Sequence, residues 1–158
     1  MTDEQKQEFT RKISNANKTA MIVILYEMVL VYVQDAKKAL EAQDREALHQ
    51  EVQRAKACVK ELQNSLNFKN DLAMNYFEIY LYLRRELSRA DVAGNATALD
   101  NVCNIVTELH DTYLKISKAD ISKPIMENTQ TVYAGLTYGK NSLNESLASQ
   151  DIDRGFRA

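Results

Sequence analysis

The sequence contains very few of the residues that form turns. Its 158 residues include only four glycines and one proline, and no glycine or proline occurs from Met1 to Ala93. Folds that are rich in strands need such residues where the chain turns, so an all-β or α/β fold is nearly excluded. Apolar residues make up 45% and charged residues 27% of the chain, which suits one soluble, packed domain.

The sequence also has few cysteines and no large excess of charge of either sign. Cys58 and Cys103 are the only cysteines and form no CxxC pair, so we expect reduced core residues and neither a disulfide framework nor a thiolate metal site. The 20 basic and 22 acidic side chains include no basic block, which argues against nucleic acid as a partner. The polar start of the chain does not resemble a signal peptide, so we expect a cytoplasmic protein.

The most apolar segment covers residues 20–33, where only Glu27 is charged. A membrane span needs about 20 apolar residues, so we expect a helix of a soluble protein and no membrane insertion. One apolar stripe is assigned to the core and consists of Met21, Leu25, Met28, Tyr32, Ala36 and Leu40. A second stripe exceeds what a helix packed on one side requires. It consists of Ile22, Tyr26, Val29 and Val33.

Three further helices are predicted from apolar residues at spacings of three and four. Asp44 is expected to cap the first of them and Asn70 the second. Gly94 is suited to end that second helix, and Asn95 to cap the last one. Because connections of a few residues join helices that run in opposite directions, we predict an all-α, antiparallel up-and-down four-helix bundle over residues 19–117.

The two ends of the chain are interpreted differently. We expect residues 1–18 to be a mobile N-terminal segment. Residues 118–158 contain the only proline and three of the four glycines, so we expect a C-terminal extension that is conditionally helical, with Ser122 as a reasonable helix start.

Few residues suggest catalysis or metal binding. Glu46 and His49 match half of the Glu-x-x-His motif of carboxylate di-iron bundles, but the second half is absent and a solvated helix start is the better interpretation. His110 could suggest phosphoryl transfer, but Tyr113 occupies the space that a docking partner would need. Carboxylates are scattered and glycine-rich loops are absent before Gly94. We therefore expect no enzyme, no catalytic residue, no metal and no cofactor.

The first and third predicted bundle helices carry more apolar and aromatic residues than a slim core needs. Tyrosine suits a surface that is apolar along the ring and hydrated at the hydroxyl. A larger core or a homodimer interface would also explain the surplus, but we favour a groove for a partner helix. Its predicted lining is Ile22, Tyr26, Val29, Tyr76, Phe77 and Tyr80, and the predicted core includes Leu25, Leu83, Val106 and Leu109.

A series of short motifs then carries a family resemblance. They are, in order, Ile24-Leu25-Tyr26-Glu27, Leu66-Asn67, Ala73, Asn75, Tyr80, Tyr82, Leu87 and Asp111-Thr112-Tyr113. Over residues 9–113 the chain resembles the flagellin-specific export chaperones, the FliS family. It departs from that family at Asn15-Ala16-Asn17-Lys18, which lacks the usual proline, and Phe9, with Ile13 behind it, stands in place of the N-terminal tyrosine.

The resemblance implies a cytoplasmic chaperone that binds the disordered C-terminal segment of flagellin and keeps it from polymerising before type III export. It implies a monomer or weak dimer without a cofactor, and the flagellar export gate or a co-chaperone as further candidate partners. The alternative is a non-catalytic helical scaffold or regulatory protein that self-associates through the same apolar stripes.

Segments of the chain itself are also candidates to occupy the groove. They are Phe9 and Ile13 near the start and Val132, Tyr133, Leu136 and Leu143 in the extension, together with Leu147. A linked ligand has a high effective concentration, so truncation after Ile121 should then tighten flagellin binding. Residues 154–157, Arg-Gly-Phe-Arg, resemble an exposed docking tag whose partner the sequence does not select.

Overall fold

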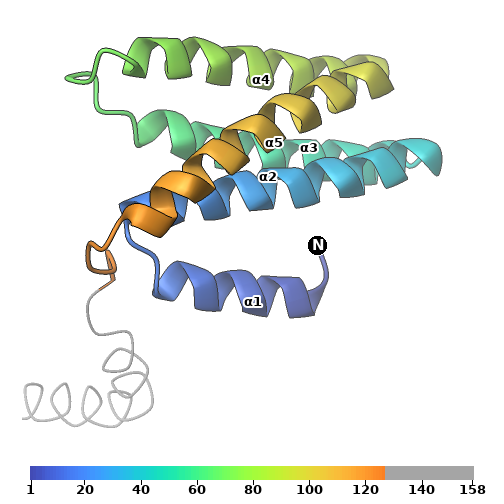
Figure 1. The fold of residues 1–158 in the computed structure, drawn as a ribbon. Helices are drawn as coiled ribbons and strands as arrows, with labels where there is room; N and C mark the ends of the chain where they lie inside the picture. Colours follow the sequence, from blue (N-terminus) through green and yellow to red (C-terminus); the bar gives the residue numbers. More distant parts are fainter. Residues whose placement is uncertain (127–158) are drawn as a thin grey trace, which may run out of the picture. The chain divides into compact units, whose positions relative to one another are not determined.

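The computed structural model describes residues 1–126, and within this range it contains five helices and no strand (Figure 1). The helices are α1 (Asp3–Ser14), α2 (Lys18–Glu41), α3 (Arg45–Asn64), α4 (Ala73–Ala93) and α5 (Ala96–Ala119). The prediction of an all-α fold is confirmed. Helix α2 packs against α3 and α5, and α4 packs against the same two helices. From α2 to α5 each helix reverses the direction of the one before it (Figure 1).

Side-chain caps and one glycine fix helix ends where the sequence predicts them. The carboxylate of Asp44 accepts a backbone N–H of α3 at 2.9 Å, and the amide oxygen of Asn95 accepts one of α5 at 3.0 Å. Gly94 ends α4 with φ 61° and ψ 39°, in the left-handed region. An added Cβ at Gly94 would lie 3.1 Å from Nη1 of Arg45. Both the backbone conformation and the limited space at this position therefore favour glycine.

The connection between α3 and α4 differs from the prediction. Asn70 does not cap α4, because its side-chain oxygen accepts the N–H of Leu72 at 3.0 Å and forms a local turn. Helix α4 then begins at Ala73 without a side-chain cap. The connection carries two exposed apolar side chains, Phe68 at 59% and Leu72 at 56% exposure.

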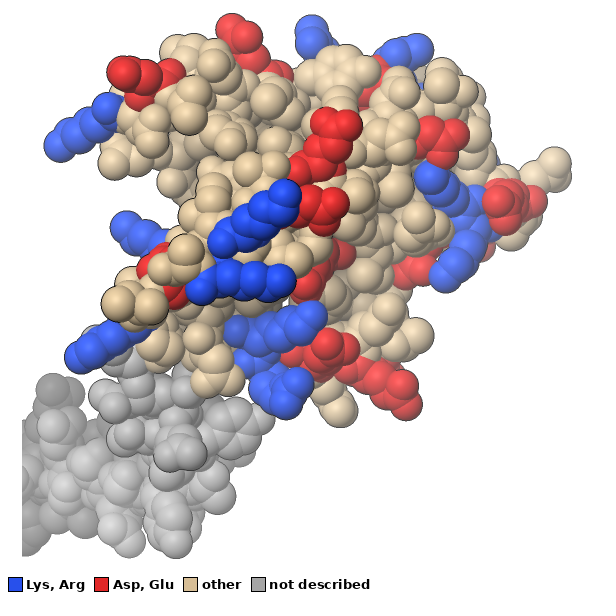
Figure 2. All heavy atoms as spheres, in the orientation of Figure 1, with Lys and Arg blue, Asp and Glu red and all other residues tan. Residues whose placement is uncertain are grey.

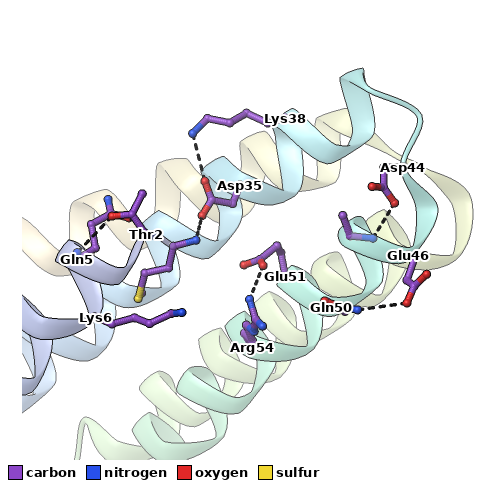
Figure 3. Close-up of polar contacts among 12 residues, drawn as sticks. Thr2, Gln5, Lys6, Asp35, Lys38, Asp44, Glu46, Gln50, Glu51 and Arg54 are labelled. Carbon is purple, nitrogen blue, oxygen red and sulfur yellow. Dashed lines mark hydrogen bonds and ion pairs between the residues drawn. The ribbon is translucent and has the colours of Figure 1, made fainter.

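Residues 1–18 contain helix α1 in place of the expected mobile segment. A capping box between Thr2 and Gln5 starts the helix (Figure 3). Phe9 is buried, and half-buried Ile13 packs beside it against an outer face of α2. The sequence-based expectation failed here because so short and polar a segment becomes a stable helix only when a partner surface buries its few apolar side chains.

The two apolar stripes of α2 do not divide between core and groove as predicted, because Ala36 of the first stripe is in the core and so is most of the second stripe. Tyr26, Val29 and Val33 are completely buried among α3, α4 and α5, so these three residues of the second stripe are core. Leu25 and Met28 of the first stripe are only partly buried. The physical reason is that α1 covers the other side of α2, where Phe9, Ala16 and Ile24 form a separate buried cluster with Met21, Met28 and Val31 around it.

Helix α2 is the one helix among the described residues that is long and apolar enough to cross a membrane by length and composition. Its apolar side chains have another use, because they contact α1 on one side and the core on the other. Packing within the protein therefore accounts for the apolar composition of α2.

The chain after α5 is attached to the start of α2. The amide of Asn17 donates to the carbonyl oxygens of Asp120 and Ser122, each at 3.3 Å. The hydroxyl of Thr19 donates to the Asp120 carboxylate, and this bond lowers the pKa of Asp120. No helix starts at Ser122 within the described residues. The predictions for Val132, Tyr133, Leu136 and Leu143 and for residues 154–157 lie outside the described residues.

Candidate partner-binding site

Four tyrosines from three helices meet near the connection between α3 and α4. They are Tyr26 of α2, Tyr76 and Tyr80 of α4, and Tyr113 of α5, and we call them the tyrosine cluster. The ring centroids of Tyr26 and Tyr113 are 5.7 Å apart, and those of Tyr76 and Tyr113 are 5.8 Å apart in an edge-on arrangement. Such distances are those of favourable aromatic contacts, so the cluster joins the three helices.

The innermost part of the tyrosine cluster is a hydrogen bond between two hydroxyl groups. The oxygen atoms of Tyr26 and Tyr80 are 2.6 Å apart in the core. Burial raises the pKa of Tyr26 far above its usual range and raises the pKa of Tyr80 to about 12. Burial also raises the pKa of Tyr113. These three hydroxyls therefore remain protonated and neutral at physiological pH.

A pocket of about 250 Å³ lies over the tyrosine cluster, and we call it the tyrosine pocket. Its lining comes from α2, the α3–α4 connection, α4 and α5 and consists of Ile22, Ser65, Leu66, Asn67, Asn70, Leu72, Ala73, Tyr76, Tyr80, Tyr113 and Ile116. The volume lies below the roughly 300–1,000 Å³ of typical small-molecule sites. The pocket suits one or two apolar side chains of a larger partner.

A second cavity, the α4/α5 groove, has a volume of about 620 Å³. Its apolar lining consists of Ile79, Tyr82, Ile105 and Leu109, which are all partly buried. Its polar lining consists of Asn75, Glu78, Arg85 and Glu108. An apolar floor between polar rims is the form that accepts the apolar face of an amphipathic helix.

Exposed apolar side chains lie in and around the tyrosine pocket. Leu72 and Ile116 line it and are 56% and 48% exposed. Nearby in sequence, Phe68 and Met74 are 59% and 55% exposed. Single exposed apolar residues are common, but two of them in the lining of one cavity indicate a contact surface.

The structure separates the six predicted groove residues into three groups. Ile22, Tyr76 and Tyr80 line the tyrosine pocket. Tyr26 and Val29 are 0% exposed and cannot contact a partner, which corrects the prediction for both. Their apolar character serves the core because α3 and α5 cover this face of α2. Phe77 is half-buried, with its ring edge-on to Phe68 at 5.9 Å, and lines none of the described cavities.

Sequence reasoning missed part of the pocket lining. Leu72 and Ile116 belong to the apolar residues from which two of the helices were predicted, but they were not assigned to the groove. Leu66 and Tyr113 were named in the family motifs but were not predicted to line the groove. The sequence does not show that these residues meet, since the α3–α4 connection and the last turns of α5 are about 45 residues apart in sequence.

The residues considered for chemistry do not converge on a site. Nδ1 of His49 lies 2.8 Å from a carboxylate oxygen of Asp91, while Glu46 bonds within α3 (Figure 3). Nε2 of His110 lies 3.7 Å from Glu27. Within the described part of the chain, no group of three or more His, Cys, Asp and Glu side chains could hold a metal ion. Figure 2 shows acidic and basic side chains interspersed over one face.

Helices that leave apolar cavities at their surface are typical of helical proteins that bind other polypeptide segments. The family model for the flagellar protein FliS matches residues 1–120. Over 101 residues the chain is 25% identical to the flagellar secretion chaperone FliS of Bacillus subtilis (strain 168), an alignment that covers 64% of this chain and 76% of the relative. The chain therefore belongs to the FliS family of flagellar export chaperones, which confirms the resemblance of its motifs.

Proposed function

We propose that this protein is a cytoplasmic, non-catalytic chaperone that binds the C-terminal segment of flagellin in its apolar cavities. In this proposal α2 to α5 form an antiparallel four-helix bundle that serves as the scaffold. Binding covers apolar surface of flagellin that would otherwise drive polymerisation before export. The observation that carries the proposal is the tyrosine pocket with Leu72 and Ile116 exposed at it.

The two cavities supply complementary contacts for a helical segment. The tyrosine pocket accepts an anchoring apolar side chain, and the α4/α5 groove accepts the apolar face of a helix. Ordering a disordered segment costs several kcal/mol, so contacts at more than one place and an interface above about 1,600 Å² are expected. Tyr76 and Tyr113 add ring surface and hydroxyl groups to the lining of the tyrosine pocket.

The tyrosine cluster preorganises the pocket. Tyr26 is completely buried behind it and contacts the hydroxyl of Tyr80. Tyr26 therefore supports the pocket floor without touching a partner. A rigid floor reduces the loss of side-chain entropy on binding, which is an established route to higher affinity.

The test is a double charge substitution at the pocket. In the variant with Leu72→Asp and Ile116→Asp, two exposed apolar side chains become charged, so folding should persist while the anchor site is lost. We expect the Kd for a peptide of the flagellin C-terminal segment, measured by calorimetry, to rise by at least about tenfold. The matched control is Val92→Asp, an apolar side chain that is 82% exposed and lines none of the described cavities.

Flagellin polymerisation provides a second readout. The unaltered protein and the Val92→Asp control should suppress the turbidity of polymerising flagellin, and the double variant should not. Equal Kd values for the double variant and the control, with both folded, would refute the proposal.

We further propose that the protein is a monomer or weak dimer. Most of the second stripe of α2 is in the core, and Met21 and Met28 of the first stripe pack in the cluster with Phe9 of α1, which leaves little of α2 for self-association. Light scattering at low micromolar concentration tests this point. The export gate or a co-chaperone remains a further proposed partner.

A further inference from the structure

The groove between α3 and α4 differs in charge from the other two cavities. We call it the α3/α4 groove; its volume is about 490 Å³. Its lining consists of Lys56, Leu81, Arg84, Arg85, Ser88 and Arg89. Four of these six residues are cationic and none is acidic. The α4/α5 groove shares Arg85 with the α3/α4 groove but also has the carboxylates of Glu78 and Glu108 in its lining.

Three cations of the α3/α4 groove lack an acidic partner. Within residues 1–126, neither Lys56, Arg84 nor Arg85 forms an ion pair. The Nε atom of Arg84 is buried and has no hydrogen-bond partner in that range. Buried donors are normally paired, so an unpaired one beside an open groove indicates a place where a ligand acceptor is missing.

The hydrogen bonds that Lys56 and Arg84 form are to neutral groups and do not neutralise their positive charge. Lys56 donates to the hydroxyl of Ser88 at 3.1 Å, and Arg84 donates to the amide oxygen of Gln63 at 3.2 Å. Among the four cations, only Arg89 pairs with a carboxylate within residues 1–126, since its Nη1 lies 2.6 Å from Glu86. The protein as a whole has a formal net charge of -2, so this concentration of positive charge is local.

The apolar side chain in the lining of the α3/α4 groove indicates which kind of anionic partner the groove can bind. Leu81 lines the groove with 39% of its surface exposed, between cations on both neighbouring helices. A phosphate backbone would gain nothing from an apolar floor, whereas a helix with acidic side chains beside a leucine or methionine matches both features.

We infer that the α3/α4 groove binds an acidic amphipathic segment of a second protein, at a site separate from the tyrosine pocket. Carboxylates of that segment pair with Lys56, Arg84 and Arg85, and an apolar side chain lies on Leu81. Opposite charge across the interface speeds association and selects acidic partners over neutral ones.

The probe is a helical peptide of about 20 residues, long enough to hold helical structure, with leucines on one face flanked by glutamates. A matched peptide has glutamine at every glutamate position. Fluorescence anisotropy measures the Kd of each peptide for the full chain. We expect binding of the acidic peptide only, weakening as salt rises from about 50 to about 200 mM because the charges become screened.

Two groove variants and one control variant locate the binding to the groove. Lys56→Glu should raise the Kd of the acidic peptide by about tenfold, while Lys18→Glu, the same charge change at the exposed start of α2, should change it by less than about twofold. Leu81→Ser should also raise the Kd of the acidic peptide, since it removes the apolar side chain from the groove. Lys56→Glu should leave the Kd of the flagellin segment unchanged.

Several results would overturn the inference. Equal affinity of the glutamine peptide would remove the role of charge, and an unchanged Kd in folded Lys56→Glu would place binding elsewhere. A single-stranded oligonucleotide could also displace the peptide. If Leu81→Ser left the Kd of that oligonucleotide unchanged, the groove would be a phosphate-binding site instead. If Lys56→Glu raised the Kd of the flagellin segment as much as that of the acidic peptide, the groove would be part of the flagellin-binding site.

Discussion

The hydroxyl oxygens of Tyr26 and Tyr80 lie 2.6 Å apart and connect α2 with α4 through the core. Tyr26 is 0% and Tyr80 is 2% exposed, so the bond is shielded from water. One of these residues lines the tyrosine pocket and the other does not. The stability of the core and the shape of the pocket therefore depend on the same pair of side chains.

Removing either hydroxyl of this pair should destabilise the fold. Tyr26→Phe leaves the Tyr80 hydroxyl without its partner, and Tyr80→Phe does the reverse, so each should lower the free energy of unfolding by about 1–3 kcal/mol. The double variant should lose clearly less than the sum of the two, because no hydroxyl is then left unpaired. Urea unfolding followed by circular dichroism measures all three; strictly additive losses would mean that the bond contributes nothing.

Alkaline pH should unfold the protein with a recognisable slope. The pKa of Tyr80 is raised to about 12 by burial, above its ordinary value of 10.0. Its contribution is fully present below pH 10 and is lost as the pH rises toward 12, because the unfolded chain loses this proton first. Tyr26 and Tyr113 act in the same direction.

The expected slope for one tyrosine is a loss of at most about 1.4 kcal/mol of unfolding free energy per pH unit in this window. Urea titrations at successive pH values measure it. Tyr80→Phe should show a shallower decline than the unaltered protein, and identical declines would contradict the assignment.

Gly94 should resist substitution by alanine. Its φ of 61° costs an L-residue about 1–2 kcal/mol, and the added methyl group would crowd Arg45, whose Nη2 donates to the carbonyl oxygens of Asp91 and Val92. Gly94→Ala should lower the melting temperature, and Gly94→Asn should lower it less because asparagine tolerates this conformation better. A melting temperature equal to that of the unaltered protein would exclude both effects.

Helix α1 should detach independently of the rest. Phe9 is its buried residue, and Nζ of Lys12 lies 2.8 Å from Glu27 of α2. Phe9→Ala removes the main apolar contact, so amide hydrogen exchange should accelerate in α1 while α3 keeps its protection. Ile121→Ala, at a side chain that is 98% exposed, is the control and should change neither. Acceleration throughout all helices would instead make α1 part of one cooperative unit.

Helix positions were largely predictable because their signals are local. Asp44 and Asn95 cap the helices that follow them through bonds to an N–H three residues later, and Gly94 ends the helix before it through its own backbone conformation. Asn70 shows the limit of this reasoning. A side chain of the right type at the right spacing formed a turn with Leu72 instead, because two local conformations compete for the same oxygen atom.

The candidate site was less predictable than the helices. Periodicity identifies apolar stripes but does not say which neighbour covers each one, and α2 has neighbours on two sides. The stripe with Tyr26 and Val29 was therefore assigned to a groove, although α3 and α5 bury it. Ile22 and Tyr80 line the tyrosine pocket, but only the fold brings Tyr113 and Ile116 to them.

The amino-acid sequence alone determined the helical class, most helix ends and the motifs of the family, since each depends on residues that are close in the chain. Tertiary structure decided that α1 covers α2, that Tyr26 supports the pocket from behind, and that cations gather beside Leu81 between α3 and α4. These features depend on contacts between residues far apart in sequence, and burial is a property of the neighbours as much as of the residue itself.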